Sequence, residues 1–214
     1  MRKLTEKEKQ RKEYFDKICE KMESDGYEKK DMTVGVVKAN VMALIFPLPF
    51  VALACTAYFR ANPSGAGVED IGAGIWEIPF MYLAALIILI VVHELIHGIT
   101  WAAFAKNHFR SIDFGVVWEM ITPYCTCSEP LKKWQYITGG AMPTLILGGG
   151  LTAAAAACGS FPLLILAVIM IFGGGGDIFI ILKMLMFVPE AEDVVYYDHP
   201  YECGVVAFIK KGLY

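Results

Sequence analysis

Charged side chains are nearly absent from four long stretches of this sequence. Of its 214 residues, 19% are charged and 56% are hydrophobic, yet the four stretches contain only Lys38, Glu94, Asp177 and Lys183 as charged residues. The stretches are residues 34–59, 78–105, 136–158 and 161–187. Each exceeds the roughly 20 apolar residues that cross a bilayer core, which excludes a soluble enzyme and a disordered chain. We predict a mainly α membrane protein with about four transmembrane helices at these positions.

An excess of basic residues is also lacking, since the formal net charge is −3. A chain of this charge would repel phosphate, which argues against nucleic acid as a partner. Lys and Arg instead mark the topology, because ten lie in 1–33, four in 106–135 and two in 188–214, against one in 60–77. The positive-inside rule then predicts that both termini and the 106–135 segment lie in the cytoplasm.

Three segments are predicted along the chain. They are an N-terminal cytoplasmic amphipathic helix in 1–33, a four-span domain in 34–187 and a C-terminal cytoplasmic segment in 188–214. Thr5 and Glu8 suit a capping box at the start of the N-terminal helix, which we expect to lie along the membrane surface or to cover the cytoplasmic domain. Runs of β-branched and aromatic residues in 110–130 favour a small cytoplasmic β-hairpin after the second span. The C-terminal segment is expected to add another hairpin or a short helix.

Close cysteine pairs are also scarce, and Cys125 with Cys127 is the one present. A C-x-C pair can bind a soft metal, but without a second pair we interpret these residues as alternating positions of a strand. Four consecutive glycines, residues 173–176, precede Asp177 in the fourth stretch. They favour a break in the helix or very close helix packing, and the two are compatible.

Histidine is rare, with four in the chain, but two of them stand in the motif His93-Glu94-Leu95-Ile96-His97. Residues four apart on a helix share a face, so both imidazoles can bind one Zn²⁺ while Glu94 lies beside the metal as the catalytic base. Three ionisable groups within an apolar span are costly unless something compensates them, and a metal would do so. The alternative is a hydrogen-bonded polar cluster that joins helices.

A catalytic zinc site needs a third protein ligand, and the metzincin continuation with Gly and a third His is absent. Asp177 is the acidic residue of the fourth stretch. Counted from Pro79 and Pro162 near the outer ends of their spans, His93 is 14 residues in and Asp177 is 15 residues in. At 1.5 Å per residue these positions share one depth, roughly 8 Å short of the cytoplasmic edge of the bilayer core. Asp177 is therefore the predicted third ligand, in preference to His108 and Glu119, which are possible but lie beyond the end of the second span.

With these residues in place, the chain resembles a bacterial domain-of-unknown-function family of zincin peptidases, membrane metalloproteases similar to the site-2 proteases. The matching pieces, from about Ile78 onward, are the 93–98 motif, the 122–131 run, Met142-Pro143, Gly175-Gly176-Asp177 and Asp198-His199-Pro200. The resemblance implies a Zn²⁺ cofactor held by His93, His97 and Asp177, with Glu94 as the base. Site-2 proteases usually have glycine where this chain has Ile178, and the 198–200 pattern makes His199 an alternative third ligand.

The sequence therefore predicts a membrane-embedded zinc metallopeptidase in the bacterial cytoplasmic membrane, acting on membrane or membrane-proximal proteins near the cytoplasmic side. An exposed strand edge in 112–127 is expected to hold the substrate by strand addition. A second hypothesis is a metal-binding regulatory or interaction membrane protein whose catalytic chemistry is unused. A third is a metal transporter, which gives Glu94 no required role and for which four spans are few.

Overall fold

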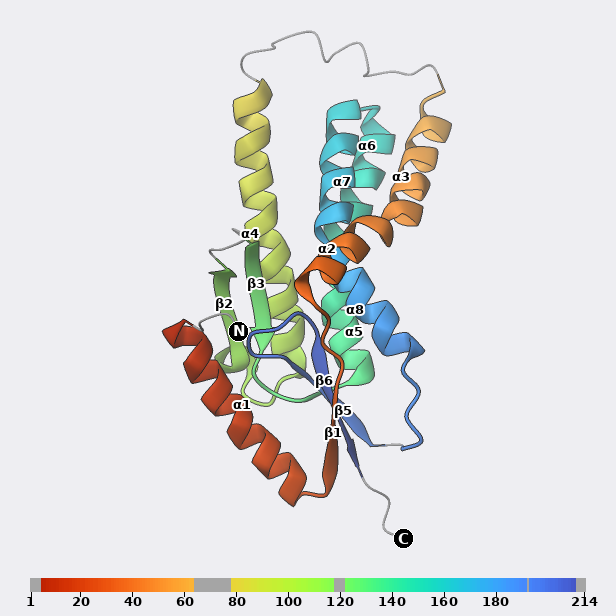
Figure 1. Cartoon of the computed structure of the whole chain (residues 1–214). Coiled ribbons are helices and arrows are strands. Elements are labelled where there is room, and N and C mark those ends of the chain that lie inside the picture. The colour runs from red at the N-terminus through yellow and green to blue at the C-terminus, as the bar shows by residue number, and fades with distance from the viewer. Residues whose placement is uncertain (1–4, 64–77, 118–121, 192, 211–214) are drawn as a thin grey trace.

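Helices dominate the computed structural model, which describes residues 5–63, 78–117, 122–191 and 193–210 (Figure 1). Three helical stretches are long and apolar enough to cross a membrane, namely Val36–Ala61, Phe80–Phe104 and Lys133–Cys158. A fourth, Phe161–Gly173 with Gly175–Met186, qualifies if this bent pair forms one span. These stretches coincide with the four predicted ones. The described part of the chain is thus mainly helical, with three to four candidate membrane-spanning helices.

Of the four stretches, the second forms one uninterrupted helix, α4 (Ile78–Phe104). The first divides at Pro47 into α2 (Val36–Ile45) and α3 (Leu48–Ala61). The third runs through α5 (Lys133–Pro143), a π-helical segment η3 (Thr144–Gly149) and α6 (Gly150–Cys158). The fourth bends by 46° between α7 (Phe161–Gly173) and α8 (Gly175–Met186). The breaks lie at Pro or Gly, the residues at which helices usually kink.

The glycines of the fourth stretch produce both effects that are predicted for them, a break in the helix and very close packing against neighbouring helices. A Cβ atom on Gly174 would lie 1.9 Å from Thr144 Oγ1, and one on Gly175 would lie 2.0 Å from the carbonyl oxygen of Ala43. Gly173 and Gly176 have nothing within 4 Å of such an atom. Gly174 and Gly175 therefore allow α8 to start against η3 and α2, which sets the position of Asp177.

The predicted hairpin follows α4 and a short 3₁₀ turn, η2 (His108–Ser111). It consists of the antiparallel strands β2 (Ile112–Val117) and β3 (Thr122–Cys127), and the residues between them, 118–121, lie outside the described part of the chain. A Cβ atom on Gly98 would lie 2.5 Å from Phe114 Cζ and 3.1 Å from Ile112 Cγ2. The hairpin thus rests directly on the helix that carries the histidine motif.

A second antiparallel sheet has the strand order β1-β6-β5-β4. Its strands are β1 (Tyr27–Asp31), β4 (Leu131–Lys132), β5 (Val194–Asp198) and β6 (Val205–Lys210). The β5–β6 pair confirms the hairpin predicted as one option for the C-terminal segment. Strand β1 corrects the prediction of one helix in 1–33, because Gly26, with φ +82°, turns the chain into a strand that pairs with β6.

Helix α1 (Glu6–Ser24) covers this four-stranded sheet. Its predicted capping box is present, since the Thr5 hydroxyl accepts the Glu8 backbone N–H and the Glu8 carboxylate accepts the Thr5 backbone N–H. Phe15 and Met22 are buried in one cluster with three side chains of β5 and β6, which are Tyr197, Val206 and Phe208. The sequence predicts that this helix lies along the membrane surface or covers another part of the protein. The structure shows the second arrangement, because the apolar side chains of the helix pack against the sheet.

Candidate metal centre

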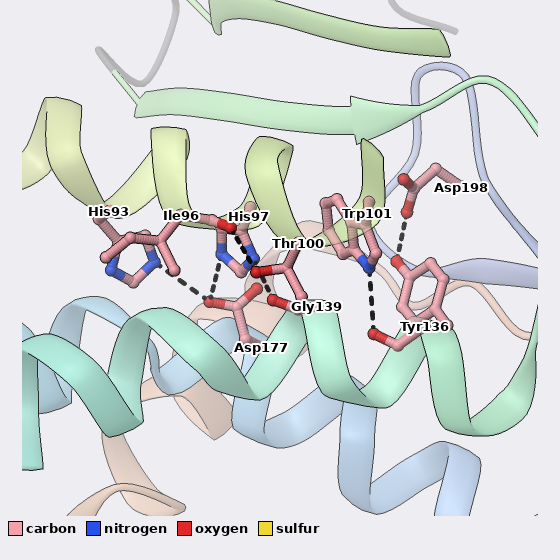
Figure 2. A network of polar contacts seen from close by, with 9 residues as sticks. All are labelled: His93, Ile96, His97, Thr100, Trp101, Tyr136, Gly139, Asp177 and Asp198. Carbon is pink, nitrogen blue, oxygen red and sulfur yellow. Dashed lines mark hydrogen bonds and ion pairs between the residues drawn. The ribbon is translucent and has the colours of Figure 1, made fainter. Parts of the chain in front are cut away.

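His93 and His97 lie one turn apart on α4 and face Asp177 in the first turn of α8 (Figure 2). Their Nε2 atoms lie 3.4 and 3.3 Å, respectively, from Asp177 Oδ2. The two histidines are 7% and 3% exposed, and the Asp177 side chain is 26% exposed. The fold therefore brings the three residues predicted as metal ligands into one largely buried group.

The spacing of this group suits a tetrahedral zinc ion. Zinc binds histidine nitrogen at about 2.0–2.1 Å and carboxylate oxygen at about 2.0–2.2 Å, so two ligand atoms on a tetrahedral ion are about 3.3–3.5 Å apart. The distances from Asp177 Oδ2 to the two Nε2 atoms fall in this range and exceed the usual 2.7–3.2 Å of an N–H···O hydrogen bond. All three ligand atoms lie within 4.8 Å of one another.

The hydrogen bond at the other ring nitrogen of His97 orients this ligand. His97 Nδ1 lies 2.9 Å from the carbonyl oxygen of Gly139, which can only accept, so Nδ1 carries the proton. The lone pair of a neutral His97 ring is then on Nε2, the atom that faces Asp177. A backbone carbonyl in this position is a common partner of metal-binding histidines.

Trp101, one further turn along α4, supports the same ring. It stacks on His97 with ring centroids 4.9 Å apart at 15°, and its Nε1 donates to the carbonyl oxygen of Tyr136 at 3.1 Å. A Cβ atom on Gly139 would lie 2.0 Å from Trp101 Nε1. Gly139 therefore lets α5 approach α4 closely enough to give both the histidine and the tryptophan a backbone acceptor.

Glu94 lies on α4 between this group and the hairpin. Its carboxylate is partly buried and within hydrogen-bonding reach of the Cys125 backbone in β3. Pro123 has no N–H, so it and Val116 form a pair without mutual hydrogen bonds. Hydrogen-bonded and non-hydrogen-bonded pairs alternate along an antiparallel ladder. Cys125 and Cys127 are therefore also in non-hydrogen-bonded pairs, and their backbone N–H and C=O groups point away from β2. We call this edge of β3 the free edge because it pairs with no strand among the described residues, although its Cys127 N–H is bound by Asp198. It runs beside Glu94.

A second polar network joins α5 to this edge through Asp198, at the end of β5 (Figure 2). One carboxylate oxygen of Asp198 accepts the Tyr136 hydroxyl, and the other accepts the Cys127 backbone N–H at 2.8 Å. Trp101, Tyr136, Gly139 and Asp198 were not predicted from the sequence as site residues. Of these four, only Asp198 belongs to a pattern noted in the sequence, Asp198-His199-Pro200.

His199, the alternative third ligand, belongs to a different group with Asp31 and Glu202. Its Nδ1 accepts the backbone N–H of Glu202 at 3.0 Å. A neutral imidazole whose Nδ1 accepts a hydrogen bond carries its proton on Nε2, so neither nitrogen offers a free lone pair to a metal. This pattern is the reverse of that at His97, and it does not fit a zinc ligand.

Cys125 and Cys127 are both buried on the face of β3 that packs near α4. Burial raises the pKa of the Cys127 thiol to about 12, and burial also raises the pKa of Cys125 far above its usual value. Among the residues that the structure describes, neither cysteine belongs to a group of three or more potential metal ligands. Their positions agree with alternating strand residues.

The fold and this group define a class: a helical, membrane-type protein with a buried His-His-Asp group and a glutamate beside it. The chain belongs to a domain-of-unknown-function family described as "Putative zincin peptidase", which it matches over residues 86–192, half of its length. His93, Glu94, His97 and Asp177 all lie in the matched range. The family description points to a zinc-dependent peptidase. Neither the curated proteins nor the solved structures contain a match to the chain.

Proposed function

We propose that this protein is a membrane-embedded zinc metallopeptidase of the site-2-protease type, which hydrolyses peptide bonds of membrane or membrane-proximal proteins. The observation that carries the proposal is the His93, His97 and Asp177 group, with two nitrogen-to-oxygen distances that suit tetrahedral zinc and with Glu94 beside it. The family description supports the same class of enzyme.

In this proposal His93, His97 and Asp177 hold the metal, and Glu94 does not bind it. Bound zinc would supply Lewis acidity toward water and the peptide carbonyl. Glu94 accepts a proton from the attacking water and then donates it to the departing amine nitrogen, so the carboxylate returns to its starting state. Trp101 and the Gly139 carbonyl hold the His97 ring in the orientation that these steps require.

The free edge of β3 is the proposed binding site for the substrate backbone. Cys125 directs its backbone away from β2 and lies next to Glu94, so a segment added as a strand there would pass the catalytic carboxylate. Strand addition also keeps the substrate extended, which exposes a peptide bond that a helix would shield. Residues 106–135 contain the hairpin, and the positive-inside rule puts them, and therefore this edge, on the cytoplasmic side.

The proposal is tested by expressing the protein with a single-span membrane reporter in cells. We expect cleavage by the native chain and none by Glu94→Gln or His93→Ala, because the first variant lacks the base and the second lacks a ligand. Glu202→Gln and His199→Ala are matched controls outside the site, and both should cleave normally. Equal cleavage by the native protein and by Glu94→Gln would contradict the proposal that this protein is a zinc metallopeptidase with Glu94 as its base.

A metal-binding regulatory protein would give a different outcome. It would need the ligands but not the base, so Glu94→Gln would retain the cellular phenotype that His93→Ala abolishes. Loss of the phenotype in both variants supports the peptidase.

A further inference from the structure

We propose that Asp198 is a positioning residue that holds the substrate edge of β3 and the helix pair around His97 in a fixed relation. The link to substrate binding rests on the proposed function, whereas the coupling of the elements is a property of the fold alone. The proposal assigns a role to a side chain of the C-terminal hairpin, which lies outside the matched range of the family.

The first argument is that Asp198 uses both carboxylate oxygens on groups from different elements. One oxygen accepts the Tyr136 hydroxyl of α5, and the other accepts the Cys127 backbone N–H of β3. The Cys127 N–H is part of the free edge, so Asp198 closes that edge two residues after Cys125. A substrate strand that pairs with β3 can therefore not extend past Cys127 without displacing Asp198, which limits its extension to the part of the edge beside Glu94.

The second argument is the continuity from Tyr136 to the metal ligands. The Tyr136 ring lies 5.3 Å from the Trp101 ring, and the Tyr136 carbonyl accepts Trp101 Nε1. Trp101 in turn stacks on His97. A movement of Tyr136 toward or away from Asp198 would thus reach the ligand ring through two packed aromatic side chains.

The third argument is the setting of the carboxylate. Asp198 itself is half-buried and lines a cavity, but its partners Tyr136 and Cys127 are only 5% and 1% exposed. No cation lies in ion-pair distance of Asp198 among the described residues. A carboxylate in such surroundings is costly unless its oxygens are hydrogen-bonded. Burial accordingly raises the pKa of Asp198 to about 6. Breaking either hydrogen bond of Asp198 is therefore costly, so these bonds hold β3 and α5 in a fixed relation to β5.

The chain contains a matched control at the same four-stranded sheet. Tyr27 of β1 donates its hydroxyl to Asp193 at 2.5 Å, and this pair is exposed. It has the same chemistry as the Tyr136–Asp198 pair, but Asp193 precedes β5 at the opposite end from Asp198 and does not contact β3 or α5 by any described hydrogen bond.

The test is amide hydrogen exchange of the full chain in lipid nanodiscs, followed in peptides that cover β3 and α5. In Asp198→Asn one acceptor oxygen is lost, and in Tyr136→Phe only the hydroxyl is lost while the ring remains. We expect each variant to speed exchange in both β3 and α5 by roughly tenfold or more, as loss of a hydrogen bond to a charged group predicts. The double variant should add little, and Tyr27→Phe should leave both segments unchanged.

Unchanged exchange in β3 for Asp198→Asn or Tyr136→Phe would overturn the proposal, and so would an equal effect of Tyr27→Phe. If Asp198→Asn does not fold, Tyr136→Phe still tests the proposal, because it removes only the hydroxyl that donates to Asp198. Peptide cleavage is measured in parallel, where Asp198→Asn should raise KM while zinc per chain stays as in the native protein. If no cleavage occurs at all, the proposed function fails while the exchange data still decide the role of Asp198.

Discussion

At the scale of single residues, the direction of the hydrogen bond at Nδ1 distinguishes the candidate metal ligand His97 from His199. His97 donates from Nδ1 to a carbonyl and turns a lone pair toward Asp177, whereas His199 accepts at Nδ1 and has none to offer. The sequence predicted His93, His97 and Asp177 because a spacing of four residues and a shared depth are both readable from residue numbers. It could not predict Tyr136 and Asp198, because their contact joins positions 62 residues apart with no periodic pattern between them.

The third ligand gives a direct prediction. We expect Asp177→Ala to weaken zinc binding by more than the roughly 10–100-fold that loss of an outer hydrogen-bond partner costs, and His199→Ala to leave it unchanged. The measurement is zinc affinity of the purified chains by competition with a chelator. Zinc loss in His199→Ala with retention in Asp177→Ala would reverse the assignment.

Asp198 gives a prediction for pH. Its pKa is raised from 3.8 to about 6 by burial, so the folded chain holds a proton that the unfolded chain releases between these values. Its contribution to stability is present below about pH 4 and is lost as the pH rises through about 6, by at most about 3 kcal/mol. Unfolding followed from pH 4 to 7 should show this fall in the native chain relative to Asp198→Asn. A constant difference between the two over that range would contradict the prediction.

At the scale of elements, the four hydrophobic stretches were predictable and their interruptions only partly so. Length and apolarity identify a span, but Pro47, Pro143 and Gly174 divide three of the four spans for reasons that depend on what packs beside them. Strand β1 was missed because its sequence, Tyr27–Asp31, is nearly all polar, and pairing with β6 rather than burial makes it a strand.

The glycine run tests this packing. Gly175→Ala should destabilise the protein by about 1–3 kcal/mol, because the new methyl group would meet the backbone oxygen of Ala43, which cannot move as a side chain can. Gly173→Ala is the matched control in open space and should be neutral or stabilising by up to about 1 kcal/mol. Thermal unfolding midpoints in lipid nanodiscs compare the two. Equal midpoints would show that α8 is not held as closely against α2 as described.

At the scale of the whole molecule, the apolar helices and the strands occupy different ends (Figure 1). Both sheets and α1 lie in the lower half of the view in Figure 1, beside the C-terminal part of α4 and beside α5, so the β3 edge and Asp198 lie in the same part of the molecule as the candidate metal ligands of α4. The N-terminal half of α4 exposes large apolar side chains, for example Phe80, Met81 and Ile88, as a lipid-facing helix does. In the proposed membrane protein, the bilayer encloses this end and leaves the end with the strands in water.

The native cysteines test the proposed topology without added probes. Cys158 ends α6 on the predicted outer side and is exposed, whereas Cys19 and Cys203 lie in the predicted cytoplasmic part and are partly exposed. A membrane-impermeant maleimide should label Cys158 in intact cells, and it should reach Cys19 and Cys203 only after lysis. Cys158→Ser is the control and should show no labelling before lysis. Labelling of Cys203 in intact cells would invert the topology.

The most direct test of the central claim is hydrolysis by purified protein at matched zinc content. Native chain and Glu94→Gln are loaded to one zinc per chain and incubated in ¹⁸O-enriched water with an extended peptide that can add to β3. We predict that the native chain alone cleaves the peptide, with ¹⁸O in the new carboxyl group of the N-terminal fragment and none in the C-terminal fragment, while Glu94→Gln binds zinc equally and releases no fragments. Cleavage by Glu94→Gln at the native rate, or failure of the native chain to bind zinc, would contradict the account.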